Sequence, residues 1–240
     1  ITQNIDNLHE RGGAKNVIHM HGELIKARCE KTHKLFPYKQ LNKTLKCRCC
    51  KEAGNLRPHV VWFNEIPLFM NDIYQKIINV SGYIAEFGLM WGRNLNLFHA
   101  LRETYEPLNH TRHLIGFDTF KGFIETEKQD LGHGGPEMYQ AGAYSVPEGQ
   151  KEFLDNILSS QTSISHLSHM RRHELVEGDV TQTFSDYLTR NTHAYFALCY
   201  FDLDLYRPTK ELLELLKTRI TKGTILVFDE ALNPDYPGET

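Results

Sequence analysis

The chain has 240 residues and a formal net charge of −3, with 40% hydrophobic, 24% charged and 11% aromatic residues. This ordinary globular composition excludes collagen-like, coiled-coil and disordered chains, and the length suits one large domain or two small ones. No apolar run approaches the roughly 20 residues of a membrane helix and no signal peptide is evident, so we expect a cytoplasmic protein without a membrane partner.

Charge and cysteine are unevenly distributed along the chain. Residues 1–80 contain 13 Lys and Arg against 7 Asp and Glu, whereas residues 81–240 contain 14 against 23. Four of the five cysteines fall within the first 50 residues. One domain with an uneven surface is the alternative, but this contrast favours two domains, 1–80 and 81–240. The basic part has no stripe of alternating basic and aromatic residues, so we expect no nucleic-acid partner.

The first candidate functional residues lie in the segment Val17 to Glu23, where His19 and His21 alternate with Met20. Such alternation is typical of a strand, which would place both imidazoles on one face. A histidine that titrates near neutral pH can act as a general base. A purely structural role is the alternative for either side chain.

The clustered cysteines favour a zinc site over disulfides, because cytosolic thiols are kept reduced. Cys47 and Cys50 form a C-x-x-C pair, and Cys29 can supply a third thiolate. Thr32 occupies the position three residues after Cys29 and is a poor ligand, so His33 or Cys49 would complete the site. Free thiols are the alternative.

Several motifs of the first eighty residues, taken in order, resemble sirtuins, the NAD-dependent protein deacylases, and the bacterial class most closely. The motifs are Thr2 to Leu8 (TQNIDNL), His21-Gly22, the cysteine segment, and Arg57 to Glu65 (RPHVVWFNE). The resemblance covers residues 1–78 and implies an NAD pocket, a general base, a zinc-ribbon-like module and a strand that receives an acyl-lysine peptide by β-augmentation.

The residues to which these roles transfer are Gln3, Asn4, Ile5 and Asp6 for NAD, His21 as the base, Cys29, Cys47 and Cys50 for Zn²⁺, and Val61, Phe63, Asn64 and Glu65 for the peptide. Asn64 departs from the glycine usual in the family. The family's glycine-rich phosphate loop precedes the first motif and its closing strands should follow residue 78, so we expect only part of a sirtuin domain here.

From Gly82 onward, apolar strand-like segments alternate with helical ones, which predicts a doubly wound parallel Rossmann-like α/β sheet. The expected strands are residues 83–88, 113–117, 174–176, 194–201 and 224–228. Gly88 and Gly92 follow the first strand and precede an amphipathic run, an arrangement that presents backbone N–H groups to a nucleotide-like ligand.

Acidic residues follow three of these predicted strands. Asp118 follows the second, Asp202 and Asp204 the fourth, and Asp229-Glu230 the fifth. Since the carboxyl ends of parallel strands meet at one edge, these acids should converge on one crevice. Convergent carboxylates favour a hard divalent ion such as Mg²⁺, and helix caps or solvated loops are the alternative for each acid alone.

Together these segments resemble class I S-adenosylmethionine-dependent methyltransferases, and the macrocin-type sugar O-methyltransferases most closely. The motifs are Glu86-Phe87-Gly88, Gly116 to Phe123 (GFDTFKGF), Glu177-Gly178-Asp179, Phe201 to Thr209 (FDLDLYRPT) and Val227 to Glu230 (VFDE). The resemblance covers residues 82–240 and implies a Mg²⁺-assisted transfer of a methyl group to a small hydroxylated acceptor such as a sugar.

The cofactor-binding residues implied by the second resemblance are Glu86, Gly88, Gly92, Asp118 and Asp179, and the implied Mg²⁺ ligands are Asp202, Asp229 and Glu230. The usual last strands of this fold should follow residue 240. We therefore expect a composite chain with two partial domains, in which methyl transfer is the leading function. A sirtuin-type deacylase and a non-catalytic fusion of fragments are the alternatives, and the sequence leaves open which activity is present.

Overall fold

The computed structural model divides into two compact units, Ile1–Met70 and Asn71–Thr240. It describes residues 5–38, 45–62, 65, 67–133, 136–230 and 235–239. The boundary between the two units, after Met70, lies ten residues before the boundary expected from the sequence, because α2 (Met70–Ile77) packs with the larger unit. The Tyr74 hydroxyl donates to Glu106 at 2.6 Å, and the guanidinium of Arg112 donates to the Ile77 carbonyl at 2.9 Å.

The smaller unit holds α1 (Leu8–Arg11) and an antiparallel sheet of β1 (Gly22–Cys29), β2 (Leu35–Pro37) and β3 (Leu56–Val60), in the order β2-β1-β3. The predicted strand over residues 17–23 is wrong, because β1 begins only at Gly22. A hydrogen bond of 3.1 Å from Gly22 N to the His19 carbonyl closes a turn there. The two histidines therefore flank a turn and do not share one strand face.

Five parallel strands form the sheet of the larger unit, in the order β6-β5-β4-β7-β8. They are β4 (Tyr83–Phe87), β5 (Leu114–Asp118), β6 (His173–Glu177), β7 (Phe196–Phe201) and β8 (Ile220–Phe228). All five strands predicted from residue 82 onward are confirmed to within a few residues. The doubly wound α/β fold is confirmed with them.

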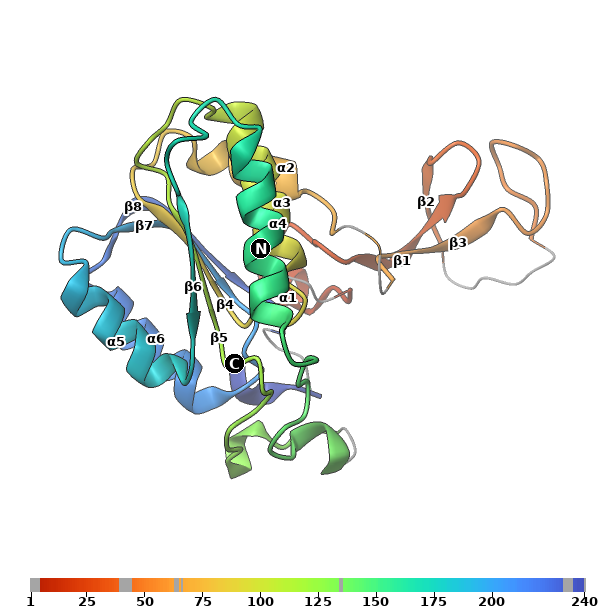
Figure 1. Ribbon diagram of the computed structural model, residues 1–240. Coiled ribbons are helices and arrows are strands. Elements are labelled where there is room, and N and C mark those ends of the chain that lie inside the picture. The colour runs from red at the N-terminus through yellow and green to blue at the C-terminus, as the bar shows by residue number, and fades with distance from the viewer. Residues whose placement is uncertain are drawn as a thin grey trace. The chain divides into compact units, whose positions relative to one another are not determined.

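Helices cover both faces of this sheet (Figure 1). On one face lie α3 (Arg93–Tyr105) and α4 (Gln150–Ser163), and on the other lie α5 (Val180–Arg190) and α6 (Tyr206–Leu216). Short 3₁₀ turns follow β5 and β8: η1 (Lys128–Asp130), η2 (Pro136–Tyr139) and η3 (Pro237–Glu239). No helix among the described segments is long and apolar enough to cross a membrane.

A row of aromatic rings at the carboxyl end of the sheet fixes the register of four strands. Phe87 pairs with Phe117 on one side and with Phe201 on the other, and Phe201 pairs with Phe228. Neighbouring ring centroids lie 5.3, 5.2 and 4.7 Å apart along this row. Because the rings are in register, the residues that follow them emerge together at one edge of the sheet.

Candidate functional site at the carboxyl edge of the parallel sheet

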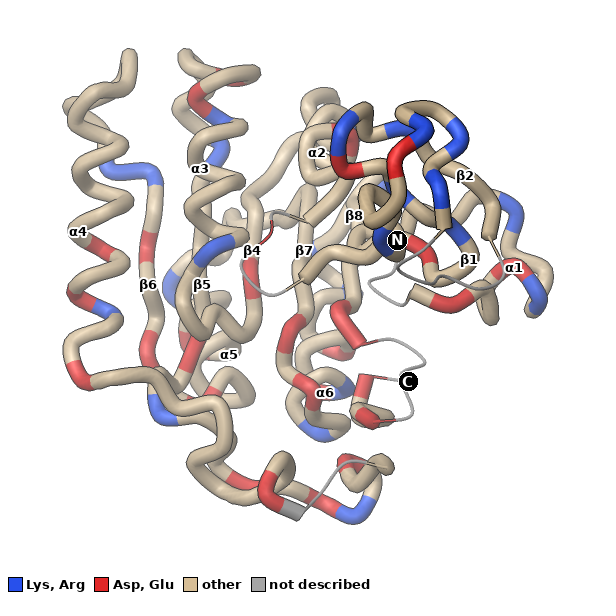
Figure 2. Tube along the Cα trace, turned by 90° about the vertical axis from the view of Figure 1, so that its right-hand side faces the viewer, with Lys and Arg blue, Asp and Glu red and all other residues tan. Residues whose placement is uncertain are grey.

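The residues that follow the aromatic row form the candidate site of the larger unit. They are Gly88, Asp118, Asp202 and Asp229, and the backbone ladder extends into them: Asp202 N donates to the Phe87 carbonyl and Asp229 N to the Phe201 carbonyl. Asp and Glu, red in Figure 2, occur at several of these strand ends. The structure thus brings together the strand-end acids that the sequence singled out.

Glu86 is the most unusual of these acids. Its side chain is 1% exposed, and neither carboxyl oxygen has a hydrogen-bond partner of good geometry among the described residues. Burial raises the pKa of Glu86 well above its ordinary value and repulsion by Asp202 adds to this, whereas a weak side-chain hydrogen bond with Asn94 lowers the pKa only in part. An unsatisfied buried carboxyl group is costly unless a ligand completes it. Its environment therefore suits a positively charged or hydrogen-bond-donating ligand.

Gly88 allows the end of β4 to pack directly against the end of β7. Its φ is +86°, and a Cβ atom there would lie 1.8 Å from the Asp202 carbonyl oxygen. Only glycine fits this close contact between two strand ends. Gly92 precedes α3 as its N-cap, also with a left-handed backbone.

Asp118 and Asp179 bind backbone groups of the chain itself. One carboxyl oxygen of Asp118 accepts from Leu89 N and, at 2.9 Å, from Met90 N, while the other accepts from Phe120 N. Asp118 therefore holds the loop after β4 against the loop after β5. Asp179 is the N-cap of α5 and accepts from Thr181 N at 2.9 Å. A ligand contact by either residue stays a prediction.

A second group of acids lies where β7 and β8 end. Burial, followed by repulsion from Glu239, Glu230 and Asp118, raises the pKa of Asp202 to about 8. Burial and neighbouring acids also raise the pKa of Asp204 and of Asp229 well above ordinary values. The Tyr200 hydroxyl donates to Asp229 at 3.1 Å. Arg93 offsets the charge at Asp202 only in part.

These oxygen donors are the kind that Mg²⁺ prefers, and their mutual repulsion would be relieved by a cation. Their oxygens are not, however, gathered as a ready-made set: within the described ranges, the cysteines alone form a group of at least three ligand atoms within 4.8 Å of one another. Asp202, Asp229 and Glu230 thus fit Mg²⁺ in chemistry, and their coordination stays a prediction.

Glu239 is a site residue that the sequence analysis missed. Its side chain is 8% exposed and accepts hydrogen bonds from the backbone of both acidic loops. Burial raises the pKa of Glu239 to about 7, and these N–H groups partly counter that effect. The only signal in the sequence was an acidic residue after a Pro-Gly turn, which did not distinguish it from other surface acids.

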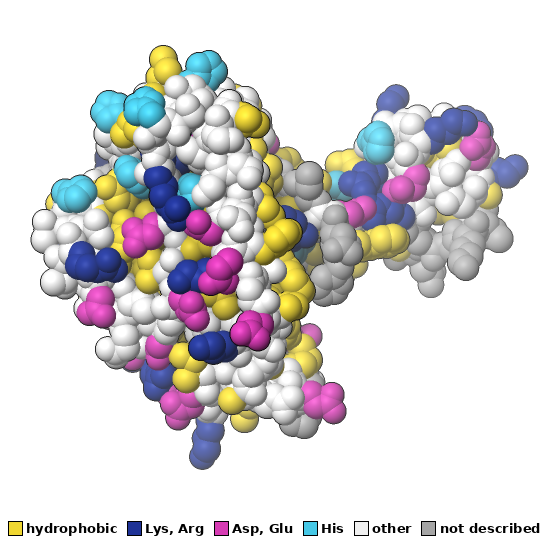
Figure 3. Space-filling view, in the orientation of Figure 1, with side chains coloured by type: hydrophobic (Ala, Val, Ile, Leu, Met, Phe, Trp, Pro, Cys, Tyr) yellow, Lys and Arg dark blue, Asp and Glu magenta, His cyan; other side chains and the backbone are white. Residues whose placement is uncertain are grey.

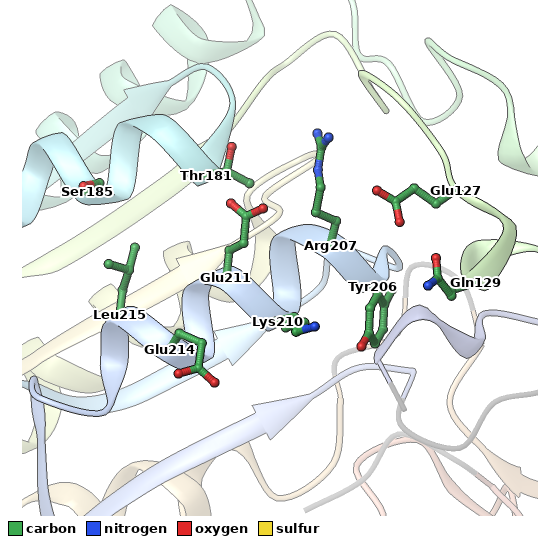
Figure 4. Close-up of a pocket in the computed structure, with 10 residues that line it drawn as sticks. All are labelled: Glu127, Gln129, Thr181, Ser185, Tyr206, Arg207, Lys210, Glu211, Glu214 and Leu215. Carbon is green, nitrogen blue, oxygen red and sulfur yellow. The ribbon is translucent and has the colours of Figure 1, made fainter.

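A separate surface groove of about 570 Å³ runs along α5 and α6 (Figure 4). Its lining includes Thr181, Arg207, Glu211 and Glu127, so charges of both signs face it. None of the predicted cofactor or metal residues lines this groove. It therefore does not belong to the strand-end site.

The smaller unit contains the predicted thiol cluster, and it brings a fourth cysteine sulfur into it. The Sγ atoms of Cys29, Cys47, Cys49 and Cys50 all lie within 4.8 Å of one another. The sulfurs of Cys29 and Cys50 are 3.8 Å apart, close to the edge of a sulfur tetrahedron around zinc with bonds of about 2.3 Å. Of the two alternatives, the structure brings Cys49 and not His33 into the cluster.

Thr32 contributes to this cluster as a hydrogen-bonding neighbour. Its hydroxyl lies 2.9 Å from the Cys49 sulfur. Hydrogen bonding by Thr32 lowers the pKa of the Cys29 thiol to about 6, against the effect of desolvation. A thiol that ionises this easily is a good zinc ligand. The cluster can therefore hold Zn²⁺, and Figure 3 shows Lys and Arg side chains on the surface of this unit.

The predicted deacylase residues are described only in part. Gln3, Asn4, Phe63 and Asn64 lie outside the described residues. The Ile5 carbonyl accepts from Leu24 N at 2.7 Å, and Asp6 accepts from Leu8 N at the start of α1.

Around His21 the backbone brings the predicted base and the predicted peptide-binding segment together. The His21 carbonyl accepts from Val61 N at 2.8 Å, and Gly22 pairs with Val60. The carboxylate of Glu65 accepts two hydrogen bonds from Arg57, at 2.7 and 2.8 Å, and these lower its pKa.

Comparison with known proteins reveals two likenesses. Residues 1–85 match the Sir2 family model. An NAD-dependent protein deacylase of Yersinia pseudotuberculosis is 37% identical over 155 residues, which are 64% of this chain and 52% of that protein. One from Vibrio cholerae is 37% identical over 155 residues, 58% of its length. The chain thus spans little more than half the length of these curated relatives.

Solved structures reveal the second likeness. The crystal structure of CalS11, a calicheamicin methyltransferase, has 44% identity and a TM-score of 0.68, covering 72% of this chain and 66% of that one. The O-methyltransferase NovP, at 16% identity and a TM-score of 0.51 over 71% of this chain and 67% of its own, shares the fold. Both resemblances expected from the sequence are confirmed.

Proposed function

We propose that the larger unit binds S-adenosylmethionine at the carboxyl edge of its sheet and transfers the methyl group to a hydroxyl of a small, sugar-like acceptor. The observation that carries this proposal is the buried carboxyl group of Glu86, whose oxygens have no hydrogen-bond partner of good geometry among the described residues. The 44% identity with CalS11 supports it. An apo structure of CalS11 is described as a TDP-rhamnose 3′-O-methyltransferase, which suggests the class of acceptor.

In this proposal each group of residues has a distinct task. S-adenosylmethionine would supply a methyl group from a positively charged sulfur, and Mg²⁺ would lower the pKa of the acceptor hydroxyl, which loses its proton as the C–S bond breaks and the C–O bond forms. Glu86 would ionise or accept a hydrogen bond beside the cationic cofactor, and Asp118 holds the loop after β4 against the loop after β5. Asp202, Asp229 and Glu230 would hold the cation.

The direct test measures transfer of radiolabelled methyl from S-adenosylmethionine to TDP-rhamnose by the full chain with Mg²⁺. We expect label in the nucleotide sugar, and loss of most of it in Glu86→Ala. A matched control is Glu211→Gln on α6, which lines the separate groove and should transfer methyl at the wild-type rate. Absence of transfer together with absence of cofactor binding would refute the proposal.

A second candidate function, NAD-dependent deacylation by the smaller unit, is favoured by the pairing of the His21 segment with Val60 and Val61. In this interpretation His21 is the general base and the chain beyond β3 receives an acyl-lysine peptide, while the cysteine cluster holds a structural zinc. The prediction is nicotinamide release from NAD that requires an acyl-lysine peptide and disappears in His21→Ala. If neither activity is found, the non-catalytic alternative is favoured.

A further inference from the structure

Glu239 connects the two acidic loops at the end of the sheet. One carboxyl oxygen accepts from Leu203 N at 2.8 Å and from Asp204 N at 3.2 Å, both in the loop after β7. The other accepts from Glu230 N at 3.3 Å, directly after β8. A single buried side chain thus binds the backbone of both loops that carry the proposed cation ligands.

These contacts oppose a repulsion built into the site. Asp202, Asp204 and Glu230 are all acidic, and Glu239 adds its own repulsion to theirs, so its role as a connection between the loops rests on the three backbone hydrogen bonds that it accepts. Hydrogen bonds from backbone N–H groups to a carboxylate are among the stronger ones in proteins. Asp204 also has a φ of +59°, an unfavourable backbone conformation for a residue with a side chain, and its N–H donates to Glu239.

The segment that carries Glu239 is itself fixed on the larger unit. The Tyr139 hydroxyl donates to the Asp235 carbonyl, and the hydroxyls of Tyr144 and Tyr236 are in hydrogen-bond contact. Gly238 lies so close to the loop after β7 that a Cβ atom would be 2.3 Å from the Asp204 carbonyl oxygen. The position of the Glu239 carboxyl group is therefore determined from both sides.

We propose that Glu239 is a positioning residue of the methyl-transfer site, which ties the loop after β7 to the loop after β8 and thereby sets the separation of the cation-binding acids. This inference rests on the proposed function. Glu239 acts through the backbone of Leu203, Asp204 and Glu230, and it does not itself contact the acceptor or the cofactor. Glu86 lies on β4, outside the two loops that Glu239 joins.

The test compares Glu239→Ala and Glu239→Gln with the control Glu214→Gln. Glu214 is an exposed residue on α6 that forms an ion pair with Lys217, directly after the helix. Mn²⁺ affinity is measured by electron paramagnetic resonance, S-adenosylmethionine affinity by calorimetry, and Tm by calorimetry on the same samples. We expect Glu239→Ala to lower Mn²⁺ affinity at least tenfold and to leave cofactor affinity within twofold of wild type. Glu239→Gln keeps an acceptor oxygen for Leu203 and Asp204, so it should lose about threefold.

Each other outcome overturns the inference in a recognisable way. Unchanged Mn²⁺ affinity in Glu239→Ala contradicts it, as does a wild-type chain that binds the cofactor but not Mn²⁺. Equal losses in the Ala and Gln variants would assign the effect to charge rather than position. Parallel loss of Mn²⁺ binding, cofactor binding and Tm would indicate a general structural role. A wild-type chain that fails to bind S-adenosylmethionine would instead refute the proposed function itself.

Discussion

Two buried histidines should remove stability from the larger unit as the pH is lowered from 8 to 5. Acids with raised pKa values, Asp202 and Glu239 among them, add stability over the same range, so the histidine contribution has to be measured separately. His99 on α3 and His173 on β6 are 0% and 4% exposed, and the Thr162 hydroxyl lies 3.0 Å from His99 Nε2. Burial, together with nearby Arg102, lowers the pKa of His99 from 6.5 to about 3. Burial and Arg171 lower the pKa of His173 from 6.5 to about 4, against the opposing effect of Asp155.

The sign and size of this effect follow from proton linkage. At pH 8 both histidines are neutral in the folded and unfolded states, so they add little pH dependence there. As the pH falls through 6.5, the histidines of the unfolded chain become protonated while those of the folded chain stay neutral, and stability falls until the folded pKa values are reached. At pH 5 the loss is about 2 kcal/mol for each histidine, or about 4 kcal/mol for an uncoupled pair.

Hydrogen exchange of the β5 amides, corrected for the intrinsic rates at each pH, measures this loss within the larger unit alone. The double variant His99→Gln/His173→Gln keeps the acids, so its comparison with wild type isolates the histidine contribution. Between pH 8 and pH 5, wild type should lose about 4 kcal/mol of opening free energy relative to the double variant. His166→Gln, at an exposed position, is the matched control and should behave like wild type. The same pH dependence in wild type and in the double variant would refute the burial argument.

Three further changes test the sites directly. Gly88→Ala should lower Tm and weaken S-adenosylmethionine binding in calorimetry, because the new Cβ would collide with the Asp202 carbonyl oxygen and displace the two strand ends. A wild-type Tm together with wild-type affinity would contradict the importance of this contact. Asp202→Asn should raise Tm by a few degrees at pH 8 while weakening Mn²⁺ binding. Burial and neighbouring acids raise the pKa of Asp202 to about 8, so removing its charge should increase the free energy of unfolding by roughly 1–3 kcal/mol. A lower Tm would contradict this prediction. The purified chain should carry about one zinc by elemental analysis, with loss in Cys49→Ser but not in His33→Gln; the reverse pattern would make His33 the ligand.

The parallel sheet could be predicted because its strands are strongly apolar and separated by helical segments. Every residue of Phe196–Phe201 is buried, so the sequence of β7 has almost no alternative to a central strand. The start of the small antiparallel sheet was harder to predict. The alternation of His and Met before Gly22 is typical of a strand, but a hydrogen bond from Gly22 N to the His19 carbonyl closes a turn there, and β1 begins only at Gly22.

The strand-end acids illustrate which features of a site can be predicted from sequence. Their positions after apolar strands predicted that they would share one edge, and the aromatic row brings this about. Whether an acid faces a ligand or the backbone of its own chain depends on the direction of its side chain, which residue spacing does not reveal. Asp118 and Asp179 accept hydrogen bonds from backbone N–H groups, whereas Glu86 accepts none from a backbone N–H group among the described residues. Glu239 lies beyond the last predicted strand, and only the folded loops bring it to Leu203 and Asp204.

Calorimetric titration of the full chain with S-adenosylmethionine tests the central claim most directly. The account predicts saturable binding of one cofactor per chain, greatly weakened in Glu86→Ala and unaffected in Glu211→Gln. No measurable binding at millimolar cofactor, in a chain shown to be folded, would contradict it.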